Sequence, residues 1–389
     1  MVLLLKVREA PHEPVSAQRI LFSAGDDSGD LHAANLMRVM RRLRPELEFV
    51  GFGMERMREA GLHPLAEERG SAMWLRNLLH LGHLRRRLHL CRTALRRGEV
   101  DLVVPVDYGG FNMYLCREAS RQGVPVCYFI PPQVWAHGRY RLKKLRKWTD
   151  RAALIYPFEP PLYEQYGVEA RYVGHPLFDQ IEQRPPSPQV VSTLRDRFGH
   201  RLVGVFPGSR EQEIEAHLPL IVETCRRVGA RIRAVQFALL CPRKLRPQLA
   251  SMLTECGIGV AMLEEVQPIE LARAAYACIT KSGTITLEIA SQGTPMVIFY
   301  RPSPIVYFLA CGLADTPYFG VVNALAGREI CPEKAIVAED ADWLTDQTLA
   351  LLGDPEAYAR CREGILETME GFARPGACER AAEYALDML

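Results

Sequence analysis

Residues 201–211 read RLVGVFPGSRE, a short apolar run that leads through a glycine turn into a helical pattern. A strand that runs through a short turn into a helix is the unit from which parallel α/β sheets are built. Backbone N–H groups at such a helix start bind anions, Gly208 lets the backbone approach closely, and Arg210 can make a two-pronged contact with a diphosphate. The same spacing also fits an ordinary cap, in which Ser209 opens the helix and Glu213 lies near its dipole.

This unit recurs along the chain in two sets separated by a proline-rich stretch. In the first set, the predicted strands are residues 19–23, 48–52, 101–106, 124–130, 152–156 and 170–173. In the second set, they are residues 201–206, 234–240, 260–263, 277–280 and 295–300. Residues 180–191 contain Pro185, Pro186 and Pro188, which cannot continue a helix or a central strand, so this stretch is predicted to be a linker. The pattern predicts an α/β protein with two Rossmann-like parallel-sheet domains that face a cleft, with ligands beyond the carboxyl ends of the strands.

The composition is that of an ordinary globular protein, and we expect neither an export signal nor a membrane span. The 389 residues are 48% hydrophobic and 24% charged, which suits roughly two to three domains. The apolar run at residues 2–5 is too short for a signal peptide, and the stretch at 305–313 is too short to span a bilayer. None of the 11 cysteines forms a Cys-x-x-Cys pair, so we expect reduced thiols rather than disulfides.

Two basic clusters lie in the first half of the chain. Residues 71–100 hold seven arginines and one acidic residue, and apolar residues recur there at steps of three and four, which predicts an amphipathic basic helix around residues 74–97. A second cluster of cations occupies residues 139–147. Together the clusters suit an anionic membrane surface, although the pattern equally fits a solvated helix whose apolar stripe faces the core. Nucleic acid is not an expected partner, because a recognisable nucleic-acid module is lacking.

A second turn of the anion-binding kind follows the predicted strand at 277–280. Ser282, Gly283 and Thr284 can present hydroxyl and N–H groups to phosphates, and Glu288 lies one helical turn beyond Thr284. A carboxylate in that position can accept both ribose hydroxyls of a nucleotide. Glu288 can equally be a surface residue that pairs with a neighbouring lysine.

Carboxylates follow two strands of the first set. Residues 23–30, SAGDDSGD, have the outline of a phosphate loop but carry three acidic side chains, which would repel a phosphate and suit hydroxyl recognition or helix capping. Asp107 follows the apolar run 101–106 and precedes Tyr108-Gly109-Gly110. A carboxylate at the carboxyl end of a strand faces the cleft, where it can act as a general base on an alcohol, or it can merely open a Gly-Gly turn.

Taken together and in order, these segments resemble the lipid-A-disaccharide synthase family of glycosyltransferases along most of the chain. The similar segments are Ser28-Gly29-Asp30-Leu31-His32, Asp107 with Phe111-Asn112, Val134-Trp135-Ala136, Pro157-Phe158-Glu159, Val173-Gly174-His175-Pro176, Pro207-Gly208-Ser209-Arg210, Ser282-Gly283-Thr284 with Leu287-Glu288, and Asn323 with Leu325-Ala326-Gly327-Arg328-Glu329. The resemblance implies the two-domain GT-B fold, with an acceptor-binding domain at 1–182 and a UDP-sugar-binding domain at 183–365. A helix within 366–389 would return to the first domain or contact a partner subunit in a homodimer.

The resemblance also implies a reaction and a role for each matching residue. UDP-2,3-diacylglucosamine would be the donor and an acylated glucosamine phosphate the acceptor, with inversion at the anomeric carbon and Asp107 as the base on the acceptor's 6-hydroxyl. The expected donor-binding residues are Ser209, Arg210, Ser282, Gly283, Thr284, Glu288 and Asn323, and the expected acceptor-binding residues are Ser28, Asp30, His32 and Trp135. No metal or other cofactor is implied, because Arg210 and helix N-termini would balance the charge of UDP. The implied location is the cytoplasm, at the inner face of the cytoplasmic membrane.

The chain departs from the family pattern mostly in the acceptor half. Gly109-Gly110 stand where the family usually has Pro-Asp, residues 73–77 read MWLRN where it has Met-Gly-x-x-Glu, His137 replaces a tryptophan, and Met54-Glu55 replace Gly-Pro. In the donor half, Lys281 replaces a small residue. The sequence therefore leaves three alternatives open: a different lipid acceptor, a UDP-sugar epimerase, and an inactive homologue that binds UDP.

Overall fold

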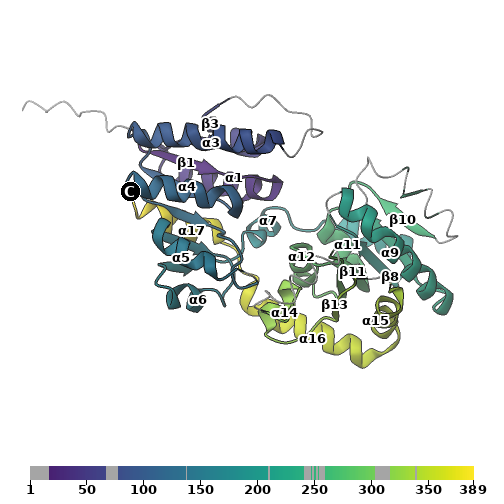
Figure 1. Ribbon diagram of the computed structural model, residues 1–389. Helices are drawn as coiled ribbons and strands as arrows, with labels where there is room; N and C mark the ends of the chain where they lie inside the picture. The colour runs from purple at the N-terminus through teal and green to yellow at the C-terminus, as the bar shows by residue number, and fades with distance from the viewer. Residues whose placement is uncertain are drawn as a thin grey trace, which may run out of the picture.

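The computed structural model describes residues 17–66, 78–136, 138–208, 211–240, 259–302, 316–337 and 340–389, together with residues 247, 249, 250 and 253. These residues form two layers of parallel strands with helices packed around them (Figure 1). Every strand pair in both layers is parallel, as the alternation of strands and helices in the sequence predicts.

The N-terminal strands make one layer in the order β3-β2-β1-β4 followed by β5-β6-β7. They are β1 (Arg19–Ser23), β2 (Glu48–Phe52), β3 (Leu62–Pro64), β4 (Leu102–Pro105), β5 (Cys127–Phe129), β6 (Arg151–Leu154) and β7 (Ala170–Tyr172). Parallel bridges from Val103 to Val126 and from Val106 to Phe129 connect β4 to β5. The accompanying helices are α1 (Asp27–Leu43), α2 (Glu55–Glu59), α3 (Leu78–Arg96), α4 (Gly109–Arg121), α5 (Tyr140–Trp148) and α6 (Pro160–Gln165). The strand order reverses between β1 and β4, which is where an open sheet of this kind leaves a crevice for ligands.

The C-terminal strands make a six-stranded sheet in the order β10-β9-β8-β11-β12-β13. They are β8 (Leu202–Phe206), β9 (Gln236–Leu240), β10 (Val260–Leu263), β11 (Ala277–Lys281), β12 (Met296–Tyr300) and β13 (Glu333–Ala335). The helices are α8 (Pro188–Phe198), α9 (Glu211–Arg231), α11 (Pro268–Ala274), α12 (Ile285–Ser291), α14 (Val321–Ala326), α15 (Ala341–Gly353) and α16 (Pro355–Phe372). The strand order here reverses between β8 and β11, so the second ligand crevice is expected beyond those two strands.

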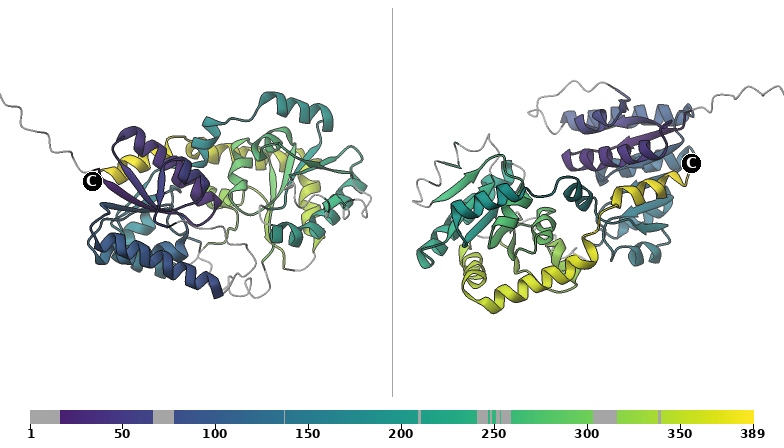
Figure 2. Two further views of the ribbon diagram at one scale, coloured as in Figure 1. Left: turned by 90° about the horizontal axis from the view of Figure 1, so that it is seen from above. Right: turned by 180° about the vertical axis from the view of Figure 1, so that it is seen from behind.

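The chain passes between the two sheets twice, and one carboxylate joins the two passages. The first passage contains α7 (Leu177–Gln183), and the second leads from the end of α16 to α17 (Ala377–Leu386). Helix α17 packs against α1 and also contacts α7 and β6, so the yellow C-terminal helix lies beside the N-terminal strands (Figure 2). Asp179 of α7 accepts hydrogen bonds from the backbone N–H groups of Gly376, Ala377 and Cys378 at 2.6, 3.0 and 2.8 Å. These bonds cap the start of α17 and hold it to the first passage.

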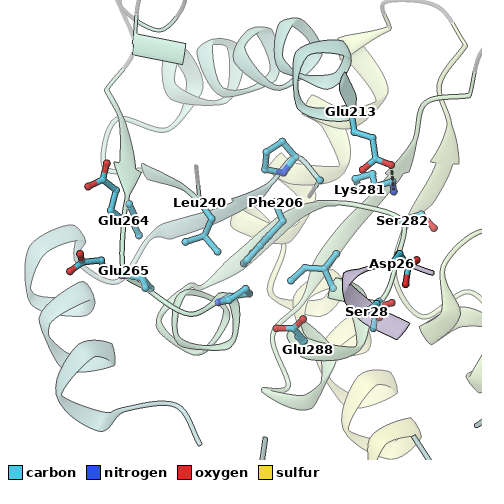
Figure 3. Close-up of a pocket in the computed structure, with 18 of the residues that line it drawn as sticks. Asp26, Ser28, Phe206, Glu213, Leu240, Glu264, Glu265, Lys281, Ser282 and Glu288 are labelled. Atoms are coloured by element: carbon cyan, nitrogen blue, oxygen red, sulfur yellow. Dashed lines mark hydrogen bonds and ion pairs between the residues drawn. The ribbon is translucent and has the colours of Figure 1, made fainter. Parts of the chain in front are cut away.

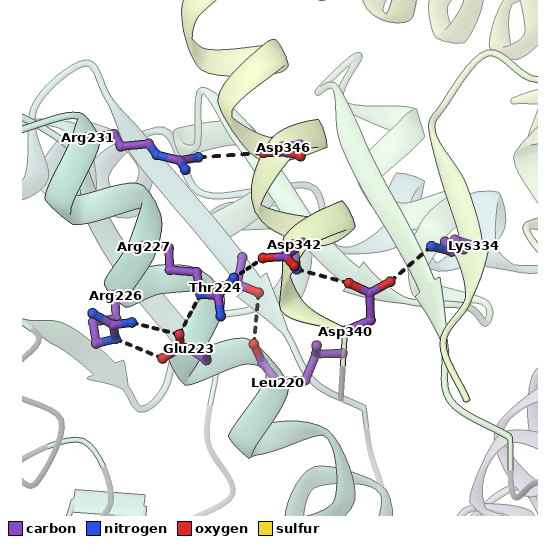
Figure 4. Close-up of polar contacts among 10 residues, drawn as sticks. All are labelled: Leu220, Glu223, Thr224, Arg226, Arg227, Arg231, Lys334, Asp340, Asp342 and Asp346. Carbon is purple, nitrogen blue, oxygen red and sulfur yellow. Dashed lines mark hydrogen bonds and ion pairs between the residues drawn. The ribbon is translucent and has the colours of Figure 1, made fainter. Parts of the chain in front are cut away.

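Ion pairs on the molecular surface accompany the packing of α15 against α9 (Figure 4). Arg227 of α9 pairs with Glu223 one turn away and with Asp342 of α15, and Arg231 lies 3.5 Å from Asp346. All of these side chains are at least one third exposed. Exposed pairs contribute about 0–1 kcal/mol each, so we attribute the docking of α15 mainly to its buried apolar residues.

Most of the predicted strands are found within a few residues of their expected bounds, and three differences have a physical reason. The short strands β3 and β13 were not predicted because three residues at a sheet edge are too few for a periodic pattern. The prediction that residues 180–191 form only a linker is wrong at both ends, because α7 extends to Gln183 and Pro188 opens α8. A proline at the first position of a helix loses no hydrogen bond, because that N–H has no partner inside the helix.

Candidate active site

A cavity of about 760 Å³ lies between the two sheets, beyond the carboxyl ends of their strands. It is lined from the N-terminal side by Asp26, Ser28 and Asp107 and from the C-terminal side by residues 206–208, 263–266 and 281–285, with Glu213, Leu240, Pro268 and Glu288. Figure 3 shows the turn with Asp26 and Ser28 facing Ser282 and Glu288. Both crevices expected from the strand order therefore open into one cavity. Within the described ranges, no three His, Cys, Asp or Glu side chains gather as metal ligands would.

Asp107 is held just beyond β4 in a backbone conformation that few residues adopt. Asp107 and Tyr108 both have left-handed backbones, with φ of 49° and 48°. The Asp107 carbonyl accepts hydrogen bonds from Asn112 Nδ2 at 2.7 Å and from the Tyr128 hydroxyl at 2.8 Å. Asn112 is fully buried and also donates to the carbonyls of Ser23 and Val106, both at 3.2 Å. These contacts tie the ends of β1 and β4 together and stabilise a strained turn of the kind that often carries functional side chains.

The surroundings of Asp107 suit a general base. Burial and, to a smaller extent, the nearby Asp26 carboxylate raise the pKa of the Asp107 carboxyl to about 6, against the opposing effect of the hydrogen bond from the Tyr108 backbone N–H. A base whose pKa lies close to the working pH combines a sufficient population of carboxylate with a useful affinity for the proton. The pKa and the position in the cavity favour this role over a carboxylate that only opens a turn.

The acidic turn at residues 23–30 is used largely for capping. Asp26 is the N-cap of α1 and accepts a hydrogen bond from the Gly29 N–H at 2.8 Å. Asp30 is 2% exposed and accepts from the backbone N–H groups of Met54, Arg56 and Met57 at 2.6, 3.0 and 3.4 Å. Asp30 therefore anchors the start of α2 and does not line the cavity, whereas Asp26 both caps α1 and faces the cavity.

The other residues predicted to bind the acceptor lie at different depths. Ser28 lines the cavity, and its hydroxyl lies 3.2 Å from Nε2 of His32, whose Nδ1 lies 3.3 Å from the Gln180 amide. Burial lowers the pKa of His32 to about 4, although the carboxylates of Asp26 and Asp179 oppose the shift, so the ring is neutral. His32 thus orients the Ser28 hydroxyl through this contact on the side away from the cavity. Trp135 does not line the cavity and makes edge-to-face contacts with Tyr156 and Phe158 at ring-centre distances of 5.8 and 5.1 Å.

On the donor side, Ser282, Gly283, Thr284 and Glu288 all line the cavity. The Glu288 side chain has no ion pair or hydrogen bond with any described residue, so the alternative of a surface pair with a lysine is not found. Burial alone raises the pKa of the Glu288 carboxyl to about 7. A buried carboxylate without a partner is costly, and ligand hydroxyl groups that donate hydrogen bonds to it would offset that cost.

Three predicted donor residues are not seen to line the cavity. Ser209 and Arg210 lie outside the described residues, although Gly208 and Glu213 on either side of them line it. Asn323 is fully buried elsewhere: its Oδ1 accepts from the N–H groups of Ile330 and Cys331, both at 2.9 Å, and its Nδ2 donates to the Cys331 carbonyl at 2.8 Å. Its amide therefore holds the turn at residues 327–331, and Asn323 is not among the residues that line the cavity.

The sequence prediction missed several residues that line the cavity. They are Asp26, Phe206, Glu213, Leu240, Leu263, Glu264, Glu265, Val266, Pro268 and Ile285. Leu240 and residues 263–266 lie at or just after the ends of predicted strands, so the rule that ligands bind beyond strand ends could have found them. For Glu213, the sequence pattern predicts only a position near a helix dipole.

The described parts of the two basic clusters lie on α3 and α5, and both helices contact α4. The apolar stripe of α3 faces the core, where Cys91 and Leu95 are buried and Leu84 and Leu88 pack against the same cluster. Arg85 and Arg86 are exposed on its other side. Helix α4 contacts both α3 and α5, and the cations of α5 at positions 143, 144, 146 and 147 are also exposed. Residues 74–77, His137 and the apolar stretch 305–313 lie outside the described residues, and none of the described helices is long and apolar enough to span a bilayer.

Comparison with protein families identifies relatives along nearly the whole chain. The family model described as lipid-A-disaccharide synthetase matches residues 20–387. A lipid-A-disaccharide synthase from Geobacter sulfurreducens is 36% identical over 96% of this chain and 98% of its own length. The lipid-A-disaccharide synthase of Myxococcus xanthus is 31% identical, over 95% of this chain and 97% of its own.

Comparison with solved structures shows the fold. The glycotransferase of kitacinnamycin has a TM-score of 0.65 at 15% identity and covers 96% of this chain and 99% of its own. The complex of Anabaena Alr3699/HepE with UDP and glucose has a TM-score of 0.59 at 12% identity and covers 95% of this chain and 99% of its own. These structures are similar over their whole length, and their likeness corresponds to the two-domain GT-B fold.

Proposed function

This chain belongs to the lipid-A-disaccharide synthetase family and is thus a glycosyltransferase of lipid A biosynthesis, and we propose that it joins UDP-2,3-diacylglucosamine to 2,3-diacylglucosamine 1-phosphate. The products would be UDP and a β-1,6-linked disaccharide 1-phosphate. The observation that carries the proposal is the shared cavity, in which Asp107 on one side faces Glu288 and residues 282–284 on the other. In this proposal residues 1–182 bind the acceptor and residues 183–365 bind the donor.

The donor would lie along the C-terminal wall of the cavity. Uracil would pack near Leu240 and residues 263–266, and the ribose hydroxyls would donate to the Glu288 carboxylate. The diphosphate would lie between the turns at 207–210 and 281–284, near the start of α9, where the helix dipole and backbone N–H groups favour an anion. Arg210 would add a charged contact there, and no metal ion is required to balance the leaving group.

The acceptor would approach from the N-terminal wall. Asp107 would take the proton of the acceptor's 6-hydroxyl as that oxygen attacks the anomeric carbon, and the bond from this carbon to UDP would break on the opposite face. A single displacement of this kind inverts the anomeric centre. Ser28 would bind an acceptor hydroxyl, with neutral His32 orienting the Ser28 side chain.

The activity test measures UDP release by the purified protein when both lipids are supplied. We expect release that requires both lipids, together with a disaccharide 1-phosphate product. Donor alone is the matched control, because conversion of the UDP-sugar without acceptor would identify an epimerase. Tight UDP binding without turnover on either lipid would instead favour an inactive homologue.

A change of lipid acceptor is the second candidate, because Gly109 packs closely against Pro132. A Cβ atom at Gly109 would lie 2.7 Å from Cγ of Pro132, so the larger residue usual in the family does not fit beside this proline. In this second candidate, the difference two residues after Asp107 would alter the acceptor side of the site. A screen of hydroxylated lipids with the same UDP-sugar would reveal an acceptor that is used faster than 2,3-diacylglucosamine 1-phosphate.

We also propose that the exposed arginines of α3 hold the protein peripherally on the anionic inner face of the cytoplasmic membrane. The apolar stripe of α3 is already buried, so this contact would be electrostatic rather than insertion of the helix. Changing Arg85 and Arg86 to serine is expected to weaken binding to anionic vesicles about 30-fold, because each cation near the surface contributes about 1 kcal/mol. Co-sedimentation with phosphatidylglycerol vesicles measures this effect.

The matched control changes Arg231 and Arg360 to serine, because these arginines are exposed on helices of the C-terminal half. That variant should sediment with vesicles like the unmodified protein. Equal binding by all three proteins would contradict the assignment of the membrane contact to α3.

A further inference from the structure

One ion pair lies inside the cavity. Lys281, the last residue of β11, has its Nζ 3.2 Å from Oε1 of Glu213 in the first turn of α9 (Figure 3). Each side chain is 22% exposed, and both line the cavity. Two charged side chains that are mostly shielded from water lose part of their hydration energy. An ion pair inside a binding site therefore suggests a role in binding.

The pair spans the gap between the two turns assigned to the diphosphate. A Cβ atom at Gly208 would lie 2.9 Å from Oε2 of Glu213, so this carboxylate lies against the turn that follows β8. A Cβ atom at Gly283 would lie 4.0 Å from Nζ of Lys281, so the ammonium group lies beside the turn that follows β11. The Glu213 carboxylate is thus an anion located where the proposed function requires the anionic part of the donor.

The charge of the cavity makes Lys281 important for an anionic ligand. Six of the described lining residues are acidic: Asp26, Asp107, Glu213, Glu264, Glu265 and Glu288. Lys281 is the one lysine or arginine among the described residues that line the cavity. A nucleoside diphosphate entering this surplus of carboxylates needs a cation, because like charges at short range repel strongly where water is scarce.

We propose that Lys281 binds the diphosphate of the donor and that Glu213 is its exchange partner in the absence of nucleotide. On binding, the phosphate oxygens would replace the carboxylate next to Nζ, and the Glu213 side chain would turn toward water. Glu213 would then keep Lys281 oriented in the empty site while weakening the affinity for UDP. This inference rests on the proposed donor site and adds a residue pair that determines its affinity for phosphate.

Isothermal titration with UDP and with uridine tests the pair, because uridine has the same base and ribose but no phosphate. We expect Lys281→Gln to weaken UDP binding about 10-fold, as for the loss of one charge-assisted hydrogen bond, and to leave uridine binding unchanged. We expect Glu213→Gln to tighten UDP binding by about 3-fold or more, because the competing carboxylate is removed. Thermal unfolding of each variant checks that the fold is retained.

Lys334→Gln is the matched control, because Lys334 forms a pair of similar length, 3.1 Å to Asp340, away from the cavity (Figure 4). It should bind UDP like the unmodified protein. Unchanged UDP affinity in Lys281→Gln, or an equal loss for UDP and uridine, would overturn the role of Lys281. Weaker UDP binding by Glu213→Gln would overturn the exchange. If the unmodified protein itself does not bind UDP, the donor site proposed above is wrong.

Discussion

Changing Asp107 to asparagine is expected to slow sugar transfer by about 10²–10⁴-fold while leaving the affinity for UDP unchanged. The amide is similar in size but cannot take the proton of the acceptor hydroxyl. The turn should keep its shape, because its hydrogen bonds from Asn112 and Tyr128 are made to the backbone carbonyl of Asp107 and not to the side chain. Initial rates with both lipids and titration with UDP measure the two quantities.

The pH dependence of the unmodified protein provides an independent check. Because the pKa of the Asp107 carboxyl is raised to about 6, the base is protonated as the pH falls through that value, and the rate should drop about tenfold for each further unit. The residual rate of Asp107→Asn should lack this drop. Asp27→Asn is the matched control, because Asp27 is an exposed residue of the neighbouring turn outside the cavity. Retention of more than a tenth of the activity by Asp107→Asn would exclude Asp107 as the base.

Changing Asp179 to alanine is expected to lower the free energy of unfolding by about 2–4 kcal/mol. Asp179 is 6% exposed, and its carboxylate accepts three hydrogen bonds from the backbone N–H groups that begin α17. Alanine leaves those groups without their acceptor next to the passage between the sheets. Urea denaturation measures the loss, and hydrogen exchange of residues 377–386 should show that α17 opens first.

Glu379→Gln on the same helix is the control for Asp179→Ala. Glu379 pairs with Arg42 at 2.8 Å, but both side chains are at least half exposed. Loss of such a pair should change the free energy of unfolding by less than about 1 kcal/mol. If the two variants are equally stable, the cap on α17 is not what holds this helix in place.

The arrangement of the two sheets was accessible from the sequence because buried parallel strands are continuous apolar runs. The runs at 19–23 and 48–52 coincide with β1 and β2, since strands in the centre of a sheet are apolar on both faces. The edge strands β3 and β13 lack such runs and depend on their neighbours for hydrogen bonds. The prediction of a linker at residues 180–191 is wrong at Pro188, because a proline ends a helix in most positions but is tolerated at the first helical position.

The candidate site was predicted best where function depends on a strand end. The sequence indicates Asp107 by its position after an apolar run and Glu288 by its position one helical turn beyond Thr284, and both residues line the cavity. Asp30 and Asn323 were assigned to ligands, but in the structure their side chains bind backbone groups. Residue type and spacing cannot distinguish these uses, because the same oxygens accept a hydrogen bond from a substrate or from a main-chain N–H. The contact between Glu213 and Lys281 joins positions 68 residues apart, which no local pattern reveals.

The return of α17 to the N-terminal strands has a consequence for synthesis on the ribosome. Helix α1 leaves the exit tunnel early, but the helix that covers it follows all the strands of the second sheet in the chain. The face of α1 that α17 covers therefore stays exposed while more than a hundred and fifty further residues are translated. We expect chaperones that bind exposed apolar surface to act during that interval, until α17 is translated and packs against α1.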